Sequence, residues 1–290
     1  RWATLALVFG TGFLLCLTFP VDTYFANCCA MLFTLIALNE AFGRQRGWLV
    51  GLALGFAILS RQLTLLTVPA VWAVLLLRRR EGRRLPGALL SVGATAIGLA
   101  ACVGFYLWLN QIRFGSPFDL GYEYIREGGW YAYRNAHWGN FSWVYVPSNL
   151  IRMFLMGFDI EFLPPGYMVP TMGTFGTSLT FSCPFIFYAL RGKISRAPGL
   201  NPIAWASIGA SCLAVLMYRC TLGSWQINAL RYTLDFMPML FVFIALGLDR
   251  VWDGFWGRVG KYLILYSIAL NLAAFVIVPA AKLILLRLPH

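Results

Sequence analysis

The chain has 290 residues, of which 60% are hydrophobic and only 12% are charged, and its mean hydropathy is +0.71. About a quarter of the residues in soluble domains are charged, so this composition excludes a soluble globular domain and indicates an integral membrane protein. The formal net charge is +12, but the cations lie in short segments between apolar stretches, where orientation in a membrane accounts for them. We therefore expect no nucleic-acid partner.

Apolar blocks of helix-spanning length follow one another along the chain, whereas an outer-membrane barrel would show a weak ten-residue alternation. The blocks predict an all-α fold, a polytopic transmembrane helix bundle of about nine crossings. We expect it to form a single domain over residues 1–290. The chain begins at Arg1 without a signal-peptide cleavage pattern, so we expect it to be N-terminally incomplete. The expected spans are residues 2–19, 23–42, 47–60, 63–77, 87–109, 176–190, 203–218, 233–249 and 261–280.

Short basic loops separate several of these spans, and the positive-inside rule places such loops in the cytoplasm. Residues 47–77 are flanked by basic loops on both sides. A single span there would leave Arg61 in the middle of the bilayer, so we expect an outward-facing hairpin with Arg61 at its apex. The basic loops contain Arg44 and Arg46, Arg78 to Arg84, Arg191 to Arg196, and Arg250 to Lys261.

Residues 110–175 form the longest connection, and we expect a long extracytoplasmic loop. Its segment "VPSNLIRMFLMGF" has a cap position before an apolar run with one arginine, which predicts a short interfacial helix on the membrane surface. The loop is rich in aromatic residues, among them Trp130, Trp138 and Trp143. They fit either an interfacial belt or a platform on which sugars stack, and the sequence leaves both alternatives open.

The outward connections also contain unusual polar residues, which are candidates for a site. Arginine is disfavoured there unless it has a role, and a guanidinium group can bind phosphate with two parallel hydrogen bonds. For any single arginine, contact with lipid headgroups is the alternative. The candidates for substrate binding are Arg61, Gln62, Arg113, Tyr122, Glu123, Arg231, Tyr232 and Asp235.

Asp22 lies in "FPVDTYFAN", at the expected outer boundary between the first two spans. Its carboxylate could accept a proton from a substrate hydroxyl or cap the helix that begins near Thr23. Asp235 could likewise favour the N-terminus of its helix or pair with Arg231. His137 has no other metal ligand near it in sequence and is expected to be structural or interfacial. No motif identifies a cofactor, and a divalent metal is left open.

Four segments resemble, in order and spacing, parts of bacterial multi-pass glycosyltransferases of the GT-C class. The nearest resemblance is to the family 39 and dolichyl-phosphate-mannose-mannosyltransferase-like proteins. It covers most of the chain, and the order of the segments carries it more than any one motif. The segments are "PVDTYFANCCAMLFTLIALNEAFGRQRGWLVGLALGFAILSRQLTLLTVPAV", "NQIRFGSPFDLGYEY", "WVYVPSNLIRMFL" and "LRYTLDFMPMLFVFIALGL".

The resemblance implies a membrane glycosyltransferase that moves a sugar from a polyprenyl-phosphate carrier to a glycan, lipid or protein acceptor. The site would face outward from a bacterial inner membrane, whose lipids are further partners. The catalytic carboxylate of this class usually lies in the first outer loop. The first span of this chain resembles a later one, so we expect the main base to be missing with the N-terminus, which leaves Asp22 as the visible candidate.

In the implied mechanism an acidic base deprotonates an acceptor hydroxyl and arginines stabilise the departing phosphate. The segment "RFGSPFDLGYEY" would begin the loop over the cavity, with Gly115 and Pro117 shaping its turn and Arg113 near the phosphate. The alternative is a transporter or a flippase for lipid-linked substrates, which would use the same cavity without transfer chemistry. Such proteins often contain inverted repeats, and we find none in this sequence.

Overall fold

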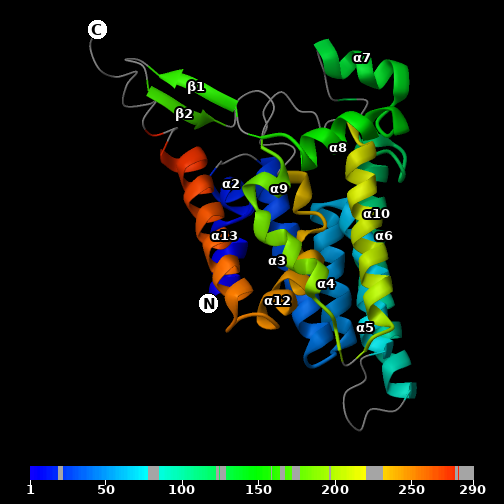
Figure 1. The fold of residues 1–290 in the computed structure, drawn as a ribbon. Helices are drawn as coiled ribbons and strands as arrows, with labels where there is room; N and C mark the ends of the chain where they lie inside the picture. Colours follow the sequence, from blue (N-terminus) through cyan, green and yellow to red (C-terminus); the bar gives the residue numbers. More distant parts are fainter. Residues whose placement is uncertain are drawn as a thin grey trace. The chain divides into compact units, whose positions relative to one another are not determined.

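The computed structural model describes residues 1–18, 22–77, 85–121, 124, 129–157, 159–163, 167–171, 177–195, 197–219, 231–277 and 280. They are predominantly helical, as the apolar blocks predict, and one two-stranded β-hairpin is added to the helices (Figure 1). The chain divides into two compact units of contacts, and the expected single domain over residues 1–290 stays a prediction. The first unit contains Arg1–Cys28, Phe141–Lys193 and Val215–His290, and the second contains Cys29–Asn140 and Ile194–Ala214.

Three of the described helices are long and apolar enough to cross a membrane. They are α3 (Asp22–Phe42), α6 (Leu85–Phe114) and α10 (Leu200–Met217), and each lies over one expected span. Shorter apolar helices lie over three more of the blocks: α4 (Gly47–Ser60), η1 (Gln62–Thr67) with α5 (Val68–Leu77), and α12 (Met237–Asp249). A helix of this kind is about 20 Å long, less than the roughly 30 Å of a bilayer core. The long helices support a membrane protein, and the bundle of about nine crossings stays a prediction.

Two of the expected spans are interrupted helices. The block 2–19 contains α1 (Trp2–Phe9) and α2 (Phe13–Thr18). Between them the Thr11 hydroxyl donates to the Leu7 carbonyl (2.6 Å) and accepts from the Phe13 N–H (3.2 Å), so a side chain replaces backbone hydrogen bonds. The block 176–190 contains α9 (Leu179–Ser182) and the 3₁₀-helix η4 (Pro184–Arg191). Pro184 has no N–H to continue α9.

The first unit contains α13 (Phe255–Leu272), which is followed by the π-helical segment η6 (Ala273–Ile277). α13 packs against α1 and η4, and α12 also packs against η4 (Figure 1). The contact between α12 and η4 is close, because a Cβ atom on Gly247 would lie 1.9 Å from the carbonyl oxygen of Tyr188. Only glycine permits this separation of the two backbones.

In the second unit α4 packs along α6 through Gly47, Gly51 and Gly55, which share one face of α4. A Cβ atom on Gly51 would lie 2.3 Å from the Thr95 carbonyl oxygen. The Thr95 hydroxyl donates to the carbonyl oxygen of Gly47 at 3.0 Å, so a polar bond is added to the close contact. Small residues that let two helix backbones approach are typical of packing within membranes.

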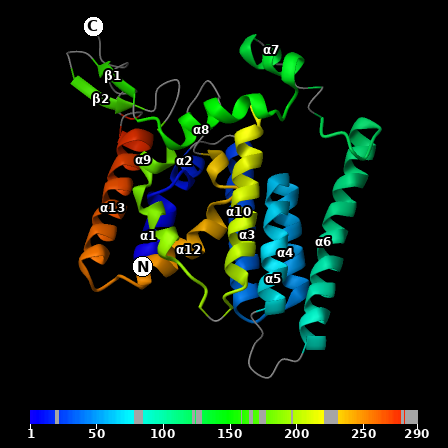
Figure 2. The same cartoon turned by 45° about the vertical axis from the view of Figure 1, so that its right-hand side comes forward.

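The long connection is ordered into short elements wherever it is described. α6 continues to Phe114, past the expected start of the connection at residue 110, and α7 (Gly129–Trp138) and η3 (Trp143–Tyr145) follow. α8 (Val146–Phe154) confirms the expected short helix, and it runs at a steep angle to α13 of the same unit (Figure 2). The antiparallel strands β1 (Asp159–Leu163) and β2 (Tyr167–Thr171) were not expected from the sequence.

Candidate functional site

Arg231 is held by side chains from two distant parts of the first unit. Its Nη1 donates to the Thr23 hydroxyl at 2.7 Å, and its Nη2 donates to the Tyr232 hydroxyl at 2.9 Å. Its guanidinium carbon also lies 4.9 Å from the centre of the Tyr24 ring and 4.7 Å from the centre of the Tyr232 ring. Cation–π contacts and hydrogen bonds together fix the orientation of the group. We call Thr23, Tyr24, Arg231 and Tyr232 the Arg231 cluster.

Local turns bring these residues to one place. Thr23 and Tyr24 lie in the first turn of α3. Residues 231–233 form a helical turn, and the next two N–H groups, those of Leu234 and Asp235, donate to the carbonyl oxygens of Arg231 and Tyr232 at 3.1 and 3.2 Å. These turns end where α12 begins at Met237. The first turn of α3 and the turns that precede α12 thus form the cluster.

The guanidinium of Arg231 has hydrogen-bond donors to spare. The group carries five N–H donors, and the described part of the chain accepts from Nη1 and Nη2. Nε is buried and has no hydrogen-bond partner there. The side chain is 7% exposed, and no salt bridge to Arg231 is found among the described residues. A buried cation without a counter-charge is costly, so the cluster is suited to an anionic ligand.

The two acidic candidates differ in their surroundings. Asp22 is exposed in the first turn of α3, next to Thr23. Both of its expected roles suit this position, because the carboxylate is accessible and also lies at a helix N-terminus. Asp235 is 2% exposed and lies just before Phe236, the N-cap residue of α12. The described residues show no salt bridge between Asp235 and Arg231, so the expected pairing of the two is not observed.

Packing extends from the cluster toward α8. The ring of Tyr232 meets the ring of Tyr218 edge-on at 5.5 Å. Asn149 of α8 is buried, and its Nδ2 donates to the carbonyl oxygens of Leu216 (2.6 Å) and Tyr218 (3.1 Å). The Asn149 side chain therefore joins α8 to the end of α10 and to Tyr218, which follows it.

The other arginine candidates lie in the second unit. Arg61 follows α4 with an extended backbone (φ −150°), so residues 47–77 divide where the sequence predicts. The neighbouring Gln62 donates to the Tyr106 hydroxyl of α6 at 2.9 Å. Arg113 is exposed in the last turn of α6, where a cation is favoured, and its guanidinium carbon lies 5.0 Å from the Phe114 ring centre. These residues are not part of the Arg231 cluster.

The segment "RFGSPFDLGYEY" begins with an ordered turn. Gly115 has a φ of +76°, a conformation that glycine adopts without strain, as its expected role in the turn requires. Asn110 donates to the Pro117 carbonyl oxygen at 3.2 Å, and the Asp119 carboxylate accepts from the Gly121 N–H at 2.7 Å. Tyr122 and Glu123 lie outside the described residues. Whether the segment covers a substrate stays a prediction.

His137 is exposed on α7 and stacks on Tyr133 with the ring centres 3.9 Å apart. Its Nδ1 lies 2.8 Å from the Tyr133 carbonyl oxygen. The described ranges contain no group of three or more His, Cys, Asp or Glu side chains that could hold a metal ion. The structural or interfacial role expected for His137 stays a prediction.

The sequence indicates Arg231 and Tyr232 as site residues, but it does not indicate Thr23, the partner of Arg231 in the cluster. The Thr23 contact spans 208 positions of the chain, and no local pattern marks it. The one usable signal was position, because Thr23 and Tyr24 follow the candidate carboxylate Asp22 directly. Comparisons of the chain with protein families, with curated proteins and with solved structures find no match.

Proposed function

We propose that the chain is a membrane glycosyltransferase that binds a polyprenyl-phosphate-linked sugar, with the carrier phosphate at the Arg231 cluster. One observation carries the proposal, the buried guanidinium of Arg231. Its Nε has no partner in the described chain, and no described carboxylate forms a salt bridge with it. A phosphate would accept hydrogen bonds from the planar fork and supply the missing negative charge.

The reaction is a displacement at the anomeric carbon of the donor sugar. The acceptor hydroxyl forms the new glycosidic bond as the bond between that carbon and the phosphate oxygen breaks, and the phosphate leaves with the electron pair. Arg231 stabilises the charge that develops on this oxygen. The proton of the acceptor hydroxyl passes to a carboxylate, and Asp22 is the candidate within this chain because it is exposed beside Thr23.

Two further observations support the proposal. The four segments that resemble GT-C glycosyltransferases include both halves of the cluster, since Thr23 and Tyr24 lie in the first and Arg231 and Tyr232 in the last. The basic loops predict that these residues face the outer side of the membrane. The proposed location is thus the bacterial inner membrane with an outward-facing site, and the acceptor is a glycan, a lipid or a protein.

The proposal is tested with the protein in liposomes and a donor that carries a radiolabelled sugar on a polyprenyl phosphate. Transfer of the label to a water-soluble or lipid acceptor, lost in Arg231→Ala, is the expected result. A flippase would instead move the intact donor across the bilayer without releasing the sugar. That outcome would contradict glycosyl transfer while leaving the phosphate site in place.

A further inference from the structure

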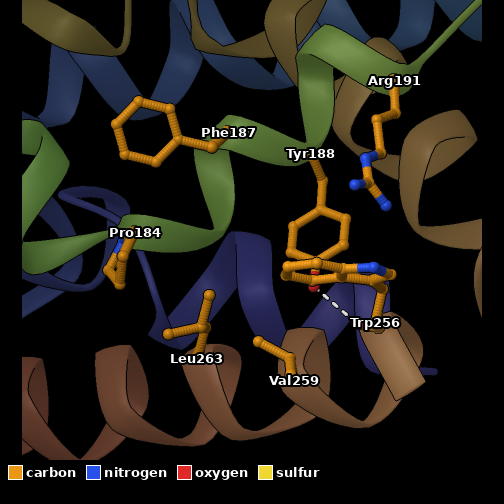
Figure 3. A pocket seen from close by; sticks show the side chains of 7 residues that line it. All are labelled: Pro184, Phe187, Tyr188, Arg191, Trp256, Val259 and Leu263. Carbon is orange, nitrogen blue, oxygen red and sulfur yellow. Dashed lines mark hydrogen bonds between the residues drawn. The ribbon is translucent and has the colours of Figure 1, made fainter.

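The first unit contains a pocket of about 240 Å³ between η4 and α13 (Figure 3). η4 contributes Phe187, Tyr188 and Arg191 to its lining, and α13 contributes Trp256, Val259 and Leu263. The Tyr188 hydroxyl donates to the Trp256 carbonyl oxygen, so this buried polar group is already satisfied inside the protein. The other side chains that line the pocket are apolar, apart from Arg191.

The polarity of the pocket changes from one end to the other. Arg191 lies at one end beside Trp256, while Pro184 and Leu263 lie at the opposite end (Figure 3). η4 has eight residues, which at about 2.0 Å per residue corresponds to a length on the order of 14 Å. Phe187 and Trp256 are 55% and 51% exposed. The pocket is therefore an apolar groove with a cation at one end.

Arg191 is positioned for an external anion. Its guanidinium carbon lies 4.8 Å from the centre of the Trp256 ring. The structure shows no hydrogen bond from this side chain to any described residue, so its donors face solvent or a ligand. Nη1 of Arg250 donates to the Arg191 carbonyl oxygen at 3.2 Å, which brings a second cation to the same end.

The sequence around the cationic end is basic. Lys193 follows η4, and Arg258 and Lys261 lie in the first turns of α13, against the nearby acidic residues Asp249 and Asp253. The excess of basic residues is the reason the positive-inside rule places both segments in the cytoplasm. The cationic end of the groove would then lie at the level of the inner leaflet headgroups.

We infer that the pocket binds one anionic phospholipid of the cytoplasmic leaflet, with its phosphate at Arg191 and an acyl chain along Phe187, Val259 and Leu263. A phospholipid matches the groove because it joins a negative headgroup to an apolar chain, and an arginine beside a tryptophan is typical of the membrane interface. The inference does not depend on sugar transfer at the Arg231 cluster, and its test uses no sugar donor.

The experiment measures quenching of Trp256 by brominated phospholipids in vesicles. The full chain is reconstituted in phosphatidylcholine, and the Trp256 signal is the difference between this protein and Trp256→Phe. Brominated phosphatidylglycerol or brominated phosphatidylcholine is then added in increasing mole fraction. We expect saturation at low mole fraction, with an apparent affinity about fivefold higher for phosphatidylglycerol, because one arginine at a membrane surface contributes about that factor.

Three variants test whether the headgroup contact and the apolar groove account for the quenching. Arg191→Gln should abolish the preference, so that phosphatidylglycerol and phosphatidylcholine bind with about equal affinity, since the headgroup contact is lost. Arg258→Gln removes the same charge from an exposed position of α13 outside the pocket and should keep the preference. Val259→Phe narrows the groove and should reduce quenching by both lipids.

Several outcomes would overturn the inference. Quenching in proportion to mole fraction, equal for both headgroups, would mean that ordinary boundary lipid covers the groove. Equal losses in Arg191→Gln and Arg258→Gln would mean that only the general basic surface attracts the lipid. An absence of quenching by either lipid, as a second copy of the chain on this face would produce, would also contradict it.

Discussion

Nη1 of Arg231 donates a hydrogen bond of 2.7 Å to the hydroxyl of Thr23, joining residues 208 positions apart. The bond connects the first turn of α3 to the turns that lead into α12. It fixes one edge of the guanidinium and leaves Nε without a partner in the described chain. The site is therefore preorganised for a ligand that accepts hydrogen bonds.

Replacement of Thr23 by valine should weaken binding of the polyprenyl-phosphate donor by about three- to tenfold. The valine keeps the shape of the side chain but removes the acceptor for Arg231. The loss should be smaller than the about 1.5–3 kcal/mol of a direct hydrogen bond to a charged group, because Thr23 acts only by positioning Arg231. Thr34→Val is the control, because Thr34 also lies in α3 but its hydroxyl donates within its own helix, to the Ala30 carbonyl oxygen. A direct binding assay in one detergent compares the two, and equal affinities would show that Thr23 does not position Arg231.

Asp22→Asn should lower the rate of sugar transfer by about 100-fold or more, the usual contribution of a general base, while donor affinity stays the same. Asparagine keeps the size of the side chain and can still accept a hydrogen bond at a helix N-terminus, so a purely capping role predicts little change in rate. Asp119→Asn is the control, since that carboxylate accepts from its local turn. Single-turnover kinetics with saturating donor separate the two roles. An unchanged rate in Asp22→Asn would assign the base to another residue.

The packing of α4 on α6 gives a prediction about stability. Gly51→Ala should destabilise the protein by about 1–3 kcal/mol, the usual cost of forcing extra volume into a packed contact, because its Cβ would meet the Thr95 carbonyl oxygen at 2.3 Å. Gly93→Ala on α6 has no heavy atom within 4 Å of the added Cβ. That variant should be stabilised by about 0.5–1 kcal/mol through helix propensity. Thermal unfolding in detergent should show opposite shifts of Tm, and equal shifts would contradict the close contact.

The orientation of the chain is tested by reporter fusions at Gly82 and Gly129. The loop-charge asymmetry predicts that position 82 lies in the cytoplasm and position 129 outside. The measurement uses a reporter that is active on only one side of the membrane. Activity on the same side at both positions would contradict the proposed orientation of the Arg231 cluster and of the groove between η4 and α13.

The sequence predicts those features that depend on a single local property, such as the length of an apolar run or an arginine in an outward connection. The long apolar runs of α3, α6 and α10 are visible because each has at least 18 residues, which is within the range that crossing a bilayer requires. Arg231 could be selected because arginine is unexpected in an outward connection next to a span. The break at Thr11 was missed because a hydroxyl that competes with backbone carbonyls leaves no change in hydropathy.

Tertiary contacts account for the other differences between prediction and structure. The contact of Arg231 with Thr23 depends on two helices that meet in the folded chain, and no local pattern specifies that meeting. The β-hairpin was missed because its strands have five residues each and lie between proline and glycine residues that read as a loop. The roles expected for Tyr122 and Glu123 stay predictions, because both lie outside the described residues.

The central claim is that Arg231 binds the phosphate of the donor, and the direct test is the affinity of the folded protein for a polyprenyl-phosphate-linked sugar. The account predicts that Arg231→Ala weakens binding by about ten- to a hundredfold, since a charge-assisted hydrogen bond contributes about 1.5–3 kcal/mol. Arg231→Lys should restore binding only in part, because lysine keeps the charge and loses the planar fork. Arg258→Ala, an exposed arginine on α13, should bind as the unchanged protein does. Equal affinities of all four proteins in one detergent would contradict the claim.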